Sequence, residues 1–213
     1  MLMRNSDNYK SKINSVSKLF SSSILAGACF ASSTLCYTNI AQAEIYTAAD
    51  DGKTIVTSTL VNTSDQVGHG IYVGSANIIF DNSAPIVLDN NTDDGMLFER
   101  STVTINADLV VTNNAANGIM SGHPNGANRG SNVIFNGTVS TSNNASHGIY
   151  ARDGLLTFNN DVTSDKVQFH FGSGVFNGNT TVKTFTLRSS GVTFGDETKD
   201  IVIDAPIRGS AGS

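Results

Sequence analysis

Acidic and basic side chains gather in two short stretches of this chain. Asp93 and Asp94 precede Arg100 in the first stretch, and Arg152 adjoins Asp153 in the second. A pair of carboxylates can serve as the acid and the base in the cleavage of a sugar chain. If the chain stacks on itself, Asp94 and Asp153 lie two turns apart, about 10 Å, at the outer limit for an inverting pair. Turn residues placed by chance explain these positions equally well.

Two histidines stand at equivalent places in the sequence. His69 and His147 each precede a glycine, and Asp94 and Asn117 hold that position in the intervening segments. In a stacked chain the two histidines are three turns apart, roughly 14 Å, which is too far to share a metal ion. We expect both to be exposed corner residues.

The other two histidines belong to different settings. His123 lies in an inserted loop, Gly122–Gly126. His170 stands between Phe169 and Phe171, and alternation along a strand predicts that it points outward between two inward phenylalanines.

The string Asp89–Gly95 is similar to a calcium-binding loop. Its glycine falls at position seven instead of six, and Arg100 occupies position twelve, where a bidentate glutamate is required. We therefore expect an ordinary acidic turn. The sequence also lacks a nucleophile elbow, a P-loop and a dinucleotide fingerprint. It predicts no catalytic residue, no cofactor and no metal site.

A repeat organises the elements that must position these side chains. A glycine is followed by an aliphatic residue four times, at Gly70-Ile71, Gly95-Met96, Gly118-Ile119 and Gly148-Ile149. Each pair precedes an apolar burst, and these bursts end at Phe80, Ile105, Phe135 and Phe158. The offset from the glycine to the last residue of the burst is ten residues for three of the pairs. For Gly118-Ile119 it is seventeen, as if a loop of seven residues were inserted. A fixed offset of this kind is typical of stacked repeats.

The bursts have the composition of short strands. They are mostly β-branched or aromatic, and Asn, Asp or Gly follows each of them, as expected for a strand that enters a turn. Two further bursts end at Phe176 and Phe194, and a second apolar set lies before most of the glycines. Asparagines at equivalent corners, such as Asn114 and Asn144, can stack and share amide hydrogen bonds.

Successive bursts end 25, 30, 23, 18 and 18 residues apart, which are the lengths of one coil of a parallel β-helix. We predict an all-β fold, a right-handed parallel β-helix (solenoid) of about six or seven short coils. An antiparallel β-sandwich also uses many short strands and is the alternative.

Residues 1–43 have the layout of a secretory signal peptide with an extended basic leader. The apolar run Ile24–Ala31 is too short to span a membrane, and Ala41-Gln42-Ala43 matches a cleavage motif that leaves Glu44 as the new amino terminus. Both cysteines lie in this segment, so residues 44–213 form one cysteine-free domain without a membrane-spanning segment. Their net charge is 9 − 17 = −8, which argues against a nucleic-acid partner.

The repeats resemble the passenger domains of bacterial autotransporters. The likeness rests on Asn113–Ile119, on Asn143–Ala151 and on Phe-Asn-Gly corners such as Phe135–Gly137. The resemblance implies export across the inner membrane and display at the cell surface or secretion when the passenger is joined to a translocator barrel. The family's barrel is absent from this sequence, so we expect a passenger truncated at its carboxy terminus, which would be periplasmic on its own.

We therefore expect a non-enzymatic passenger of adhesin or stalk type, a fragment of a longer protein. Host or bacterial surface components are its expected partners, with the Ser121–Ser131 loop as a contact surface. One alternative is a carbohydrate-active β-helix, a polysaccharide lyase or glycoside hydrolase that uses the carboxylates described above. A non-functional remnant of a broken gene is a third possibility.

Overall fold

This computed structural model describes residues 43–60, 63–123, 129–195, 198–204 and 207–210. The chain divides into two units after Thr38, and every described residue belongs to the second, Asn39–Ser213. The predicted signal peptide, apart from Ala43, lies outside the described residues, as does Ala41 of its cleavage motif. Within the described ranges, no helix is both long and apolar enough to cross a membrane.

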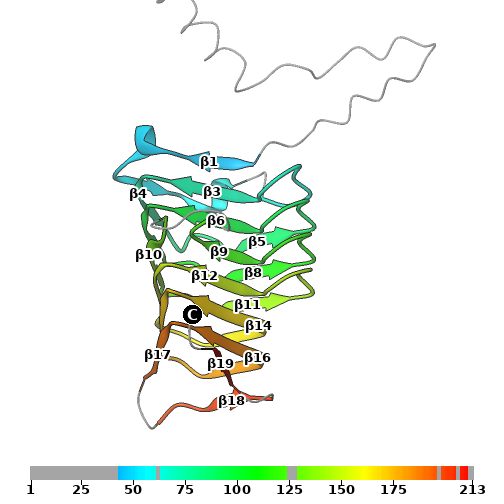
Figure 1. The fold of residues 1–213 in the computed structure, drawn as a ribbon. Coiled ribbons are helices and arrows are strands. Elements are labelled where there is room, and N and C mark those ends of the chain that lie inside the picture. The colour runs from blue at the N-terminus through cyan, green and yellow to red at the C-terminus, as the bar shows by residue number, and fades with distance from the viewer. Residues whose placement is uncertain (1–42, 61–62, 124–128, 196–197, 205–206, 211–213) are drawn as a thin grey trace, which may run out of the picture. The chain divides into compact units, whose positions relative to one another are not determined.

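Parallel strands form three ladders, and Figure 1 shows the first of them running down the stack. The first ladder contains β1 (Glu44–Tyr46), β3 (Ile71–Gly74), β6 (Met96–Glu99), β9 (Ile119–Ser121), β12 (Ile149–Arg152) and β19 (Arg208–Ser210). The second contains β2 (Lys53–Ile55), β4 (Asn77–Phe80), β7 (Thr102–Ile105), β10 (Ser131–Phe135), β13 (Gly154–Phe158), β15 (Ser173–Phe176) and β17 (Gly191–Phe194). The third contains β5 (Ile86–Asp89), β8 (Leu109–Thr112), β11 (Val139–Ser142) and β18 (Ile201–Ile203).

Two long strands join the first ladder to the third. β14 (Val162–His170) and β16 (Thr180–Arg188) pair with the third ladder through their first residues and with the first ladder through their last residues. Two short 3₁₀ helices, η1 (Ala48–Asp50) and η2 (Thr57–Thr59), precede β3. The described residues are therefore almost entirely strands and turns.

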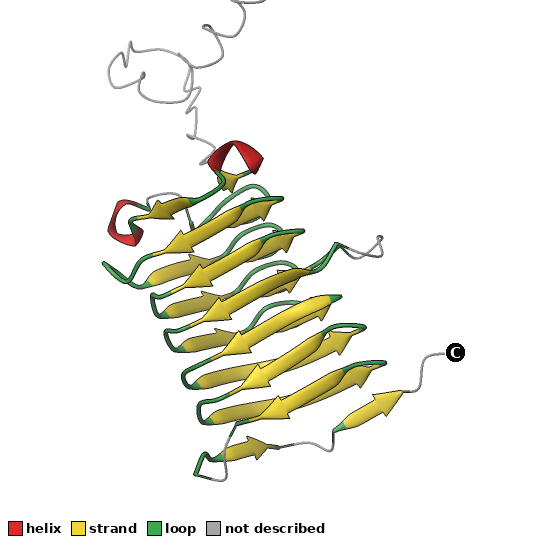
Figure 2. Ribbon diagram, turned by 90° about the vertical axis from the view of Figure 1, so that its left-hand side faces the viewer, coloured by secondary structure: helices red, strands yellow, loops and turns green. Residues whose placement is uncertain are grey.

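The chain visits the ladders in turn, so neighbours in sequence do not pair with one another. β7, for example, pairs with β4 before it and β10 after it, and both pairings are parallel. Figure 2 shows strands of successive units lying one above another. Every pairing between named strands of the described residues is parallel, so the antiparallel sandwich alternative is wrong. Hairpin neighbours would have paired in opposite directions.

The residues expected to anchor the repeat stand in register in two columns. The first column begins with the four residues that follow the anchor glycines, Ile71, Met96, Ile119 and Ile149. It continues with Val167 and Phe185, which no glycine precedes. The second ends the bursts and holds Ile55, Phe80, Ile105, Phe135, Phe158, Phe176 and Phe194. The alternate residues of the second ladder, such as Ile79 and Ile134, are about two-fifths exposed. Burial in the second ladder thus follows the two-residue period of a strand with one covered face.

The anchor glycines are required because successive units approach closely there. A Cβ atom at Gly118 would lie 2.6 Å from the carbonyl oxygen of Gly148 and 2.8 Å from Nδ2 of Asn144. The φ angle of Gly118 is not positive, so its backbone conformation would allow other residues. A side chain is excluded there by the lack of space. The glycines of these four units therefore permit the spacing of this part of the ladder, whereas Lys166 and Thr184 stand at the equivalent positions of the next two units.

Asparagine side chains also stack, in two sets with different burial. Nδ2 of Asn91 donates to Oδ1 of Asn114 at 2.8 Å, and Nδ2 of Asn114 donates to Oδ1 of Asn144 at 2.8 Å. The predicted sharing of amide hydrogen bonds between Asn114 and Asn144 is confirmed. A second set on the surface links Asn106, Asn136, Asn159 and Asn177. Side chains at equivalent corners can bond in this way because parallel stacking repeats each corner at one strand spacing.

Candidate functional site

The residues directly before the anchor glycines form a polar column at the amino ends of the first ladder. His69, Asp94, Asn117 and His147 precede Gly70, Gly95, Gly118 and Gly148, and the register of β3, β6, β9 and β12 stacks them in that order. We call these four residues the pre-glycine column. The sequence showed their equivalence, but we expected exposed corner residues. Both histidines are instead partly buried.

Hydrogen bonds connect three members of the column, Asp94, Asn117 and His147, from one unit to the next. Oδ1 of Asp94 accepts from the backbone N–H of Asn117 at 2.9 Å and from its Nδ2 at 2.8 Å. Oδ1 of Asn117 lies 3.1 Å from Nδ1 of His147, whose Nε2 lies 3.2 Å from Oε1 of Gln168. These three side chains are thus oriented by their neighbours above or below.

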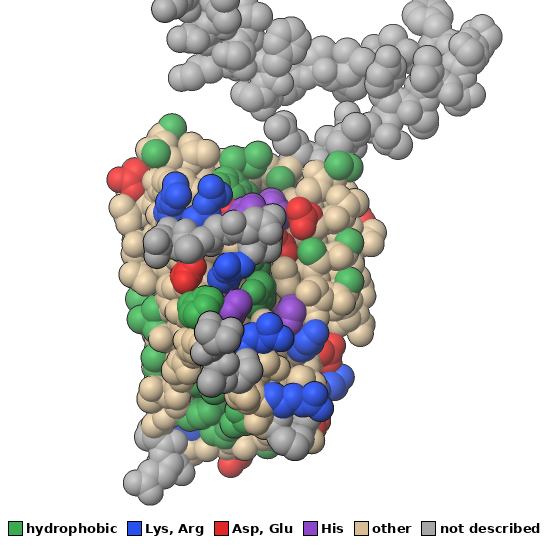
Figure 3. Space-filling view, viewed as in Figure 1, with side chains coloured by type: hydrophobic (Ala, Val, Ile, Leu, Met, Phe, Trp, Pro, Cys, Tyr) green, Lys and Arg blue, Asp and Glu red, His purple; other side chains and the backbone are tan. Residues whose placement is uncertain are grey.

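A groove of 280 Å³ runs beside the column. Its lining includes Asp94, Asn117 and His147 together with Met120 and Tyr150, which stand three residues further along β9 and β12. The rings of His147 and Tyr150 stack with centroids 5.1 Å apart and planes 21° from parallel. Figure 3 shows histidine side chains on this face of the described residues, with lysine and arginine side chains gathered nearby. An aromatic ring beside several hydrogen-bonding groups can hold a polar ligand against an apolar surface.

A basic groove of 370 Å³ continues along the same ladder. Lys166, Arg188 and Arg208 line it together with Gln168, which also lines the first groove. The three basic residues come from three different strands, β14, β16 and β19. Sequence reasoning missed this groove because no local run of basic residues marks it.

Burial shifts two titratable groups of the column in opposite directions. The pKa of Asp94 is raised, first because burial removes its carboxylate from water, although the bonds from Asn117 act against this. The pKa of His147 is lowered to about 4, first by burial and then by the positive charge of Lys166. His147 is therefore neutral at pH 7.

We expect His147 to make the stability of the protein depend on pH between about 4 and 6.5. Because its pKa is about 4 in the folded state and has the ordinary value of 6.5 in the unfolded state, the unfolded chain binds more protons in this window, and stability falls as the pH is lowered. The full shift corresponds to roughly 3 kcal/mol, and solvent at this partly exposed ring reduces the expected loss to about 1–2 kcal/mol. Urea unfolding at a series of pH values measures it.

The matched variant is His147→Asn, because asparagine holds the equivalent position at residue 117. Its unfolding free energy is expected to fall less than that of the parent as the pH drops from 6.5 to 4. Lys166 and Arg188 remain in both proteins, so the difference between the two curves isolates the imidazole. Two curves that run parallel through this window would contradict the prediction.

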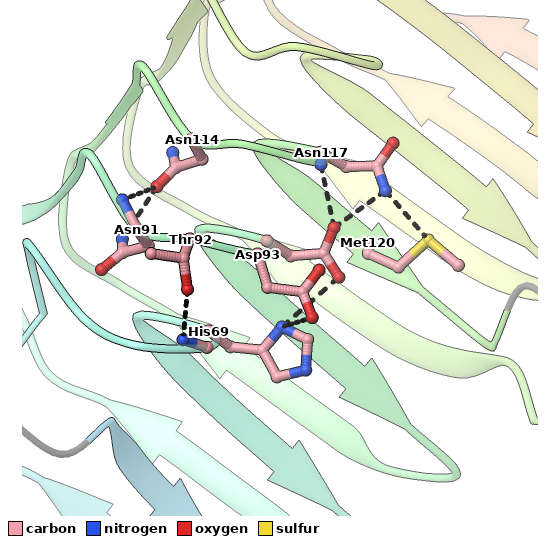
Figure 4. Close-up of polar contacts among 9 residues, drawn as sticks. His69, Asn91, Thr92, Asp93, Asn114, Asn117 and Met120 are labelled. Atoms are coloured by element: carbon pink, nitrogen blue, oxygen red, sulfur yellow. Dashed lines mark hydrogen bonds and ion pairs between the residues drawn. The ribbon is translucent and has the colours of Figure 1, made fainter.

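At the upper end of the column, His69 lies against two carboxylates of the next unit (Figure 4). Nδ1 of His69 is 3.5 Å from Oδ2 of Asp94 and 3.7 Å from Oδ2 of Asp93. This nitrogen is buried and has no hydrogen-bond partner among the described residues. Backbone bonds from Asp93 to Gly68 and from Gly70 to Asp94 hold the two loops together.

We did not foresee this cluster from the sequence. His147 stands three units from His69, whereas the acidic pair stands only one unit away. The available signal was the equivalence of His69 and Asp94, since equivalent positions of adjacent units lie about one strand spacing apart.

The calcium-like string does not gather its oxygens around one point. Asp89 accepts hydrogen bonds from Thr112 and Asn113, at one end of the string. Oδ1 of Asn91 accepts from the backbone N–H of Gln66, in the preceding unit. Asp89 and Asn91 thus tie this corner to the units on either side.

The carboxylates considered for sugar cleavage lie on opposite edges of the first ladder, one before the strands begin and the other after they end. Asp94 is two residues before β6, whereas Asp153 directly follows β12 and is equivalent to Arg100 after β6. The offset is six residues along the strand direction, roughly 20 Å at the rise of a strand. The expected separation of about 10 Å is wrong because it counted only the stacking distance. Asp153, Arg152 and Arg100 therefore form no pair with Asp94 across the groove.

Two other expectations concern the remaining histidines and the inserted loop. Phe169 is fully buried, but Phe171 is 55 % exposed and has a φ of 60°, so the chain turns there and only one phenylalanine flanks His170 from inside. The Ser121–Ser131 loop begins and ends at buried serines, and Oγ of Ser121 accepts from the backbone N–H of Ser131 at 3.3 Å. His123 is described, whereas residues 124–128 of this loop lie outside the described residues.

The fold and the site together define a class, an all-β protein of stacked parallel strands with a polar column and a groove along one ladder. No protein-family model, curated protein or solved structure matches the chain.

Proposed function

We propose that the chain is an exported, non-enzymatic passenger of an autotransporter-like surface protein, of adhesin or stalk type. In this proposal residues 1–43 are a signal peptide, and residues 44–213 form a right-handed parallel β-helix of about six or seven coils. The passenger crosses the inner membrane and reaches the cell surface when it is joined to a translocator barrel.

The observation that carries the proposal is the register of the three parallel ladders. The same kinds of residue recur at the same place in unit after unit, with apolar side chains inside and polar side chains at the corners. Such an arrangement extends by adding units and suits a stalk, because each unit contacts only its neighbours. The cysteine-free sequence after residue 43 also suits a chain that passes membranes unfolded.

The two grooves along the first ladder are the proposed contact surface. One presents Asn117, His147 and Tyr150, and the other presents Lys166 and Arg188. They share Gln168, so a single extended ligand on a host or bacterial surface could contact both. The wide separation of Asp94 from Asp153 favours binding at this surface over cleavage by that pair.

The test joins the full chain to an autotransporter translocator barrel and expresses the fusion in a Gram-negative bacterium. We expect protease added to intact cells to reach the passenger and the exported product to begin at Glu44. A fusion without residues 1–43 is the control and should stay inside the cell. Retention of the full fusion inside the cell with its amino terminus intact would overturn the proposal of export.

A second arm addresses the non-enzymatic part of the proposal. The exported product is incubated with polyuronates and neutral glycans, and we expect no release of products. Reproducible turnover that Asp94→Ala abolishes would overturn this part and favour a carbohydrate-active enzyme.

A further inference from the structure

We propose that His69, Asp93 and Asp94 bind a divalent transition-metal ion, with Zn²⁺ as the best match, and leave one coordination position open to solvent. This site goes beyond the proposed function and does not depend on it.

The spacing of the three donor atoms suits a common ion. Nδ1 of His69 and the two carboxylate oxygens all lie within 4.8 Å of one another, and the two distances from Nδ1 are 3.5 and 3.7 Å. Ligands of a tetrahedral Zn²⁺ with bonds of about 2.0–2.2 Å stand about 3.3–3.6 Å apart. The half-exposed side chain of Asp93 can rotate toward Asp94 to complete the geometry.

The unsatisfied nitrogen of His69 is the second observation. Nδ1 is buried and lacks a hydrogen-bond partner among the described residues, although two carboxylates face it. Distances of 3.5 and 3.7 Å are too long for good hydrogen bonds. They are ordinary separations between two ligands of one metal ion, which would satisfy the nitrogen and both oxygens together.

Neighbouring groups orient the three ligands as outer-shell residues do in metal sites. Asn117 donates two hydrogen bonds to Oδ1 of Asp94, which leaves Oδ2 directed at His69. The ring of Tyr72 stacks on His69 with planes 22° from parallel. The backbone N–H of Asp93 donates to Gly68, so the acidic loop is held against the loop that carries the histidine. Support of this kind raises affinity because the ligands need not be ordered on binding.

Charge and access also fit a cation. The side chain of Asp94 is 7 % exposed, so its carboxylate gains from a positive partner that water cannot replace. The side chains of Asp93 and His69 are 50 % and 24 % exposed, which leaves a path for the ion from solvent. An imidazole with two carboxylates suits Zn²⁺ better than Ca²⁺, which takes six to eight oxygens.

The test uses the full chain with Cys29→Ser and Cys36→Ser, because free thiolates would bind Zn²⁺ themselves. The protein is stripped with a chelator and titrated with Zn²⁺ by calorimetry and with Co²⁺ by visible absorption. We expect one equivalent of each ion to bind, Co²⁺ bands typical of low coordination number, and a Tm that rises with Zn²⁺. Absence of stoichiometric binding would overturn the proposal.

Single substitutions locate the ion. His69→Asn and Asp94→Asn should each weaken Zn²⁺ binding more than about tenfold and remove the Tm rise. His170→Asn, a histidine at the other end of the ladder strands, should leave both unchanged. If Asp94→Asn fails to fold, as judged by circular dichroism, His69→Asn and the half-exposed Asp93→Asn decide the outcome. Zn²⁺ binding that survives these substitutions would place the ion elsewhere and refute this site.

Discussion

Phe158→Ala is expected to lower the free energy of unfolding by about 3–5 kcal/mol. Phe158 is fully buried inside the second column, where its ring lies 4.8 Å from that of Phe135 and 4.7 Å from that of Phe176. Truncation leaves a cavity between two rings whose positions the ladder sets, so the neighbours cannot close it. The loss includes two stacked ring contacts, each worth about 0.5–1.5 kcal/mol beyond the buried area.

Equilibrium urea unfolding, followed by circular dichroism and by tyrosine fluorescence, measures this change. Two probes are needed because a stack of units can unfold in parts. Leu155→Ala is the matched control, since Leu155 belongs to the same strand and is 38 % exposed. Its expected cost is below about 1 kcal/mol. Equal costs for the two variants would mean that the phenylalanine column is not the core.

Asn114→Ala is expected to cost about 2–4 kcal/mol, a large effect for the loss of a small polar side chain. Asn114 is 1 % exposed, and its Oδ1 accepts from the backbone N–H of Asn91 while its Nδ2 donates to the carbonyl oxygen of Leu88. Alanine leaves both backbone groups buried without these partners, and each costs about 1–3 kcal/mol. The side-chain bond to Asn144 is lost as well.

The surface set of asparagines supplies the control for this variant. Asn136 makes the same kind of amide bonds, to Asn106 and from Asn159, but it is exposed. Water replaces the lost partners there, so Asn136→Ala should cost no more than about 0.5–1 kcal/mol. A comparison of urea midpoints separates the two sets. If Asn136→Ala costs as much as Asn114→Ala, burial is not what makes the inner set important.

Several features of the fold were predictable because they depend on residues that recur at fixed offsets. Ile71, Met96, Ile119 and Ile149 follow glycines at the same place in each unit, and in the structure they pair in register. A recurring apolar residue at a fixed offset is typical of stacked units, because each unit covers the apolar side chains of the unit before it. The parallel, all-β character followed from this pattern.

The candidate site was predictable only in part. The equivalence of His69, Asp94, Asn117 and His147 was visible, but their mutual hydrogen bonds and the approach of His69 to Asp93 were not. The predicted distance of about 10 Å between Asp94 and Asp153 was wrong, because it included the stacking of the units but not the positions of the two residues along their strands. Phe171 was also assigned to the wrong side, since its positive φ ends the alternation of β14.

The amino-acid sequence by itself therefore determined which apolar side chains of the recurring strands face inward, because burial at a two-residue period within each repeat has one favourable arrangement. It did not determine where that alternation ends, as Phe171 shows. Only the tertiary structure decided which polar side chains meet. Corner residues meet across units separated by 18 to 30 residues, and their distances depend on strand register and on the path of each loop, which no local pattern encodes.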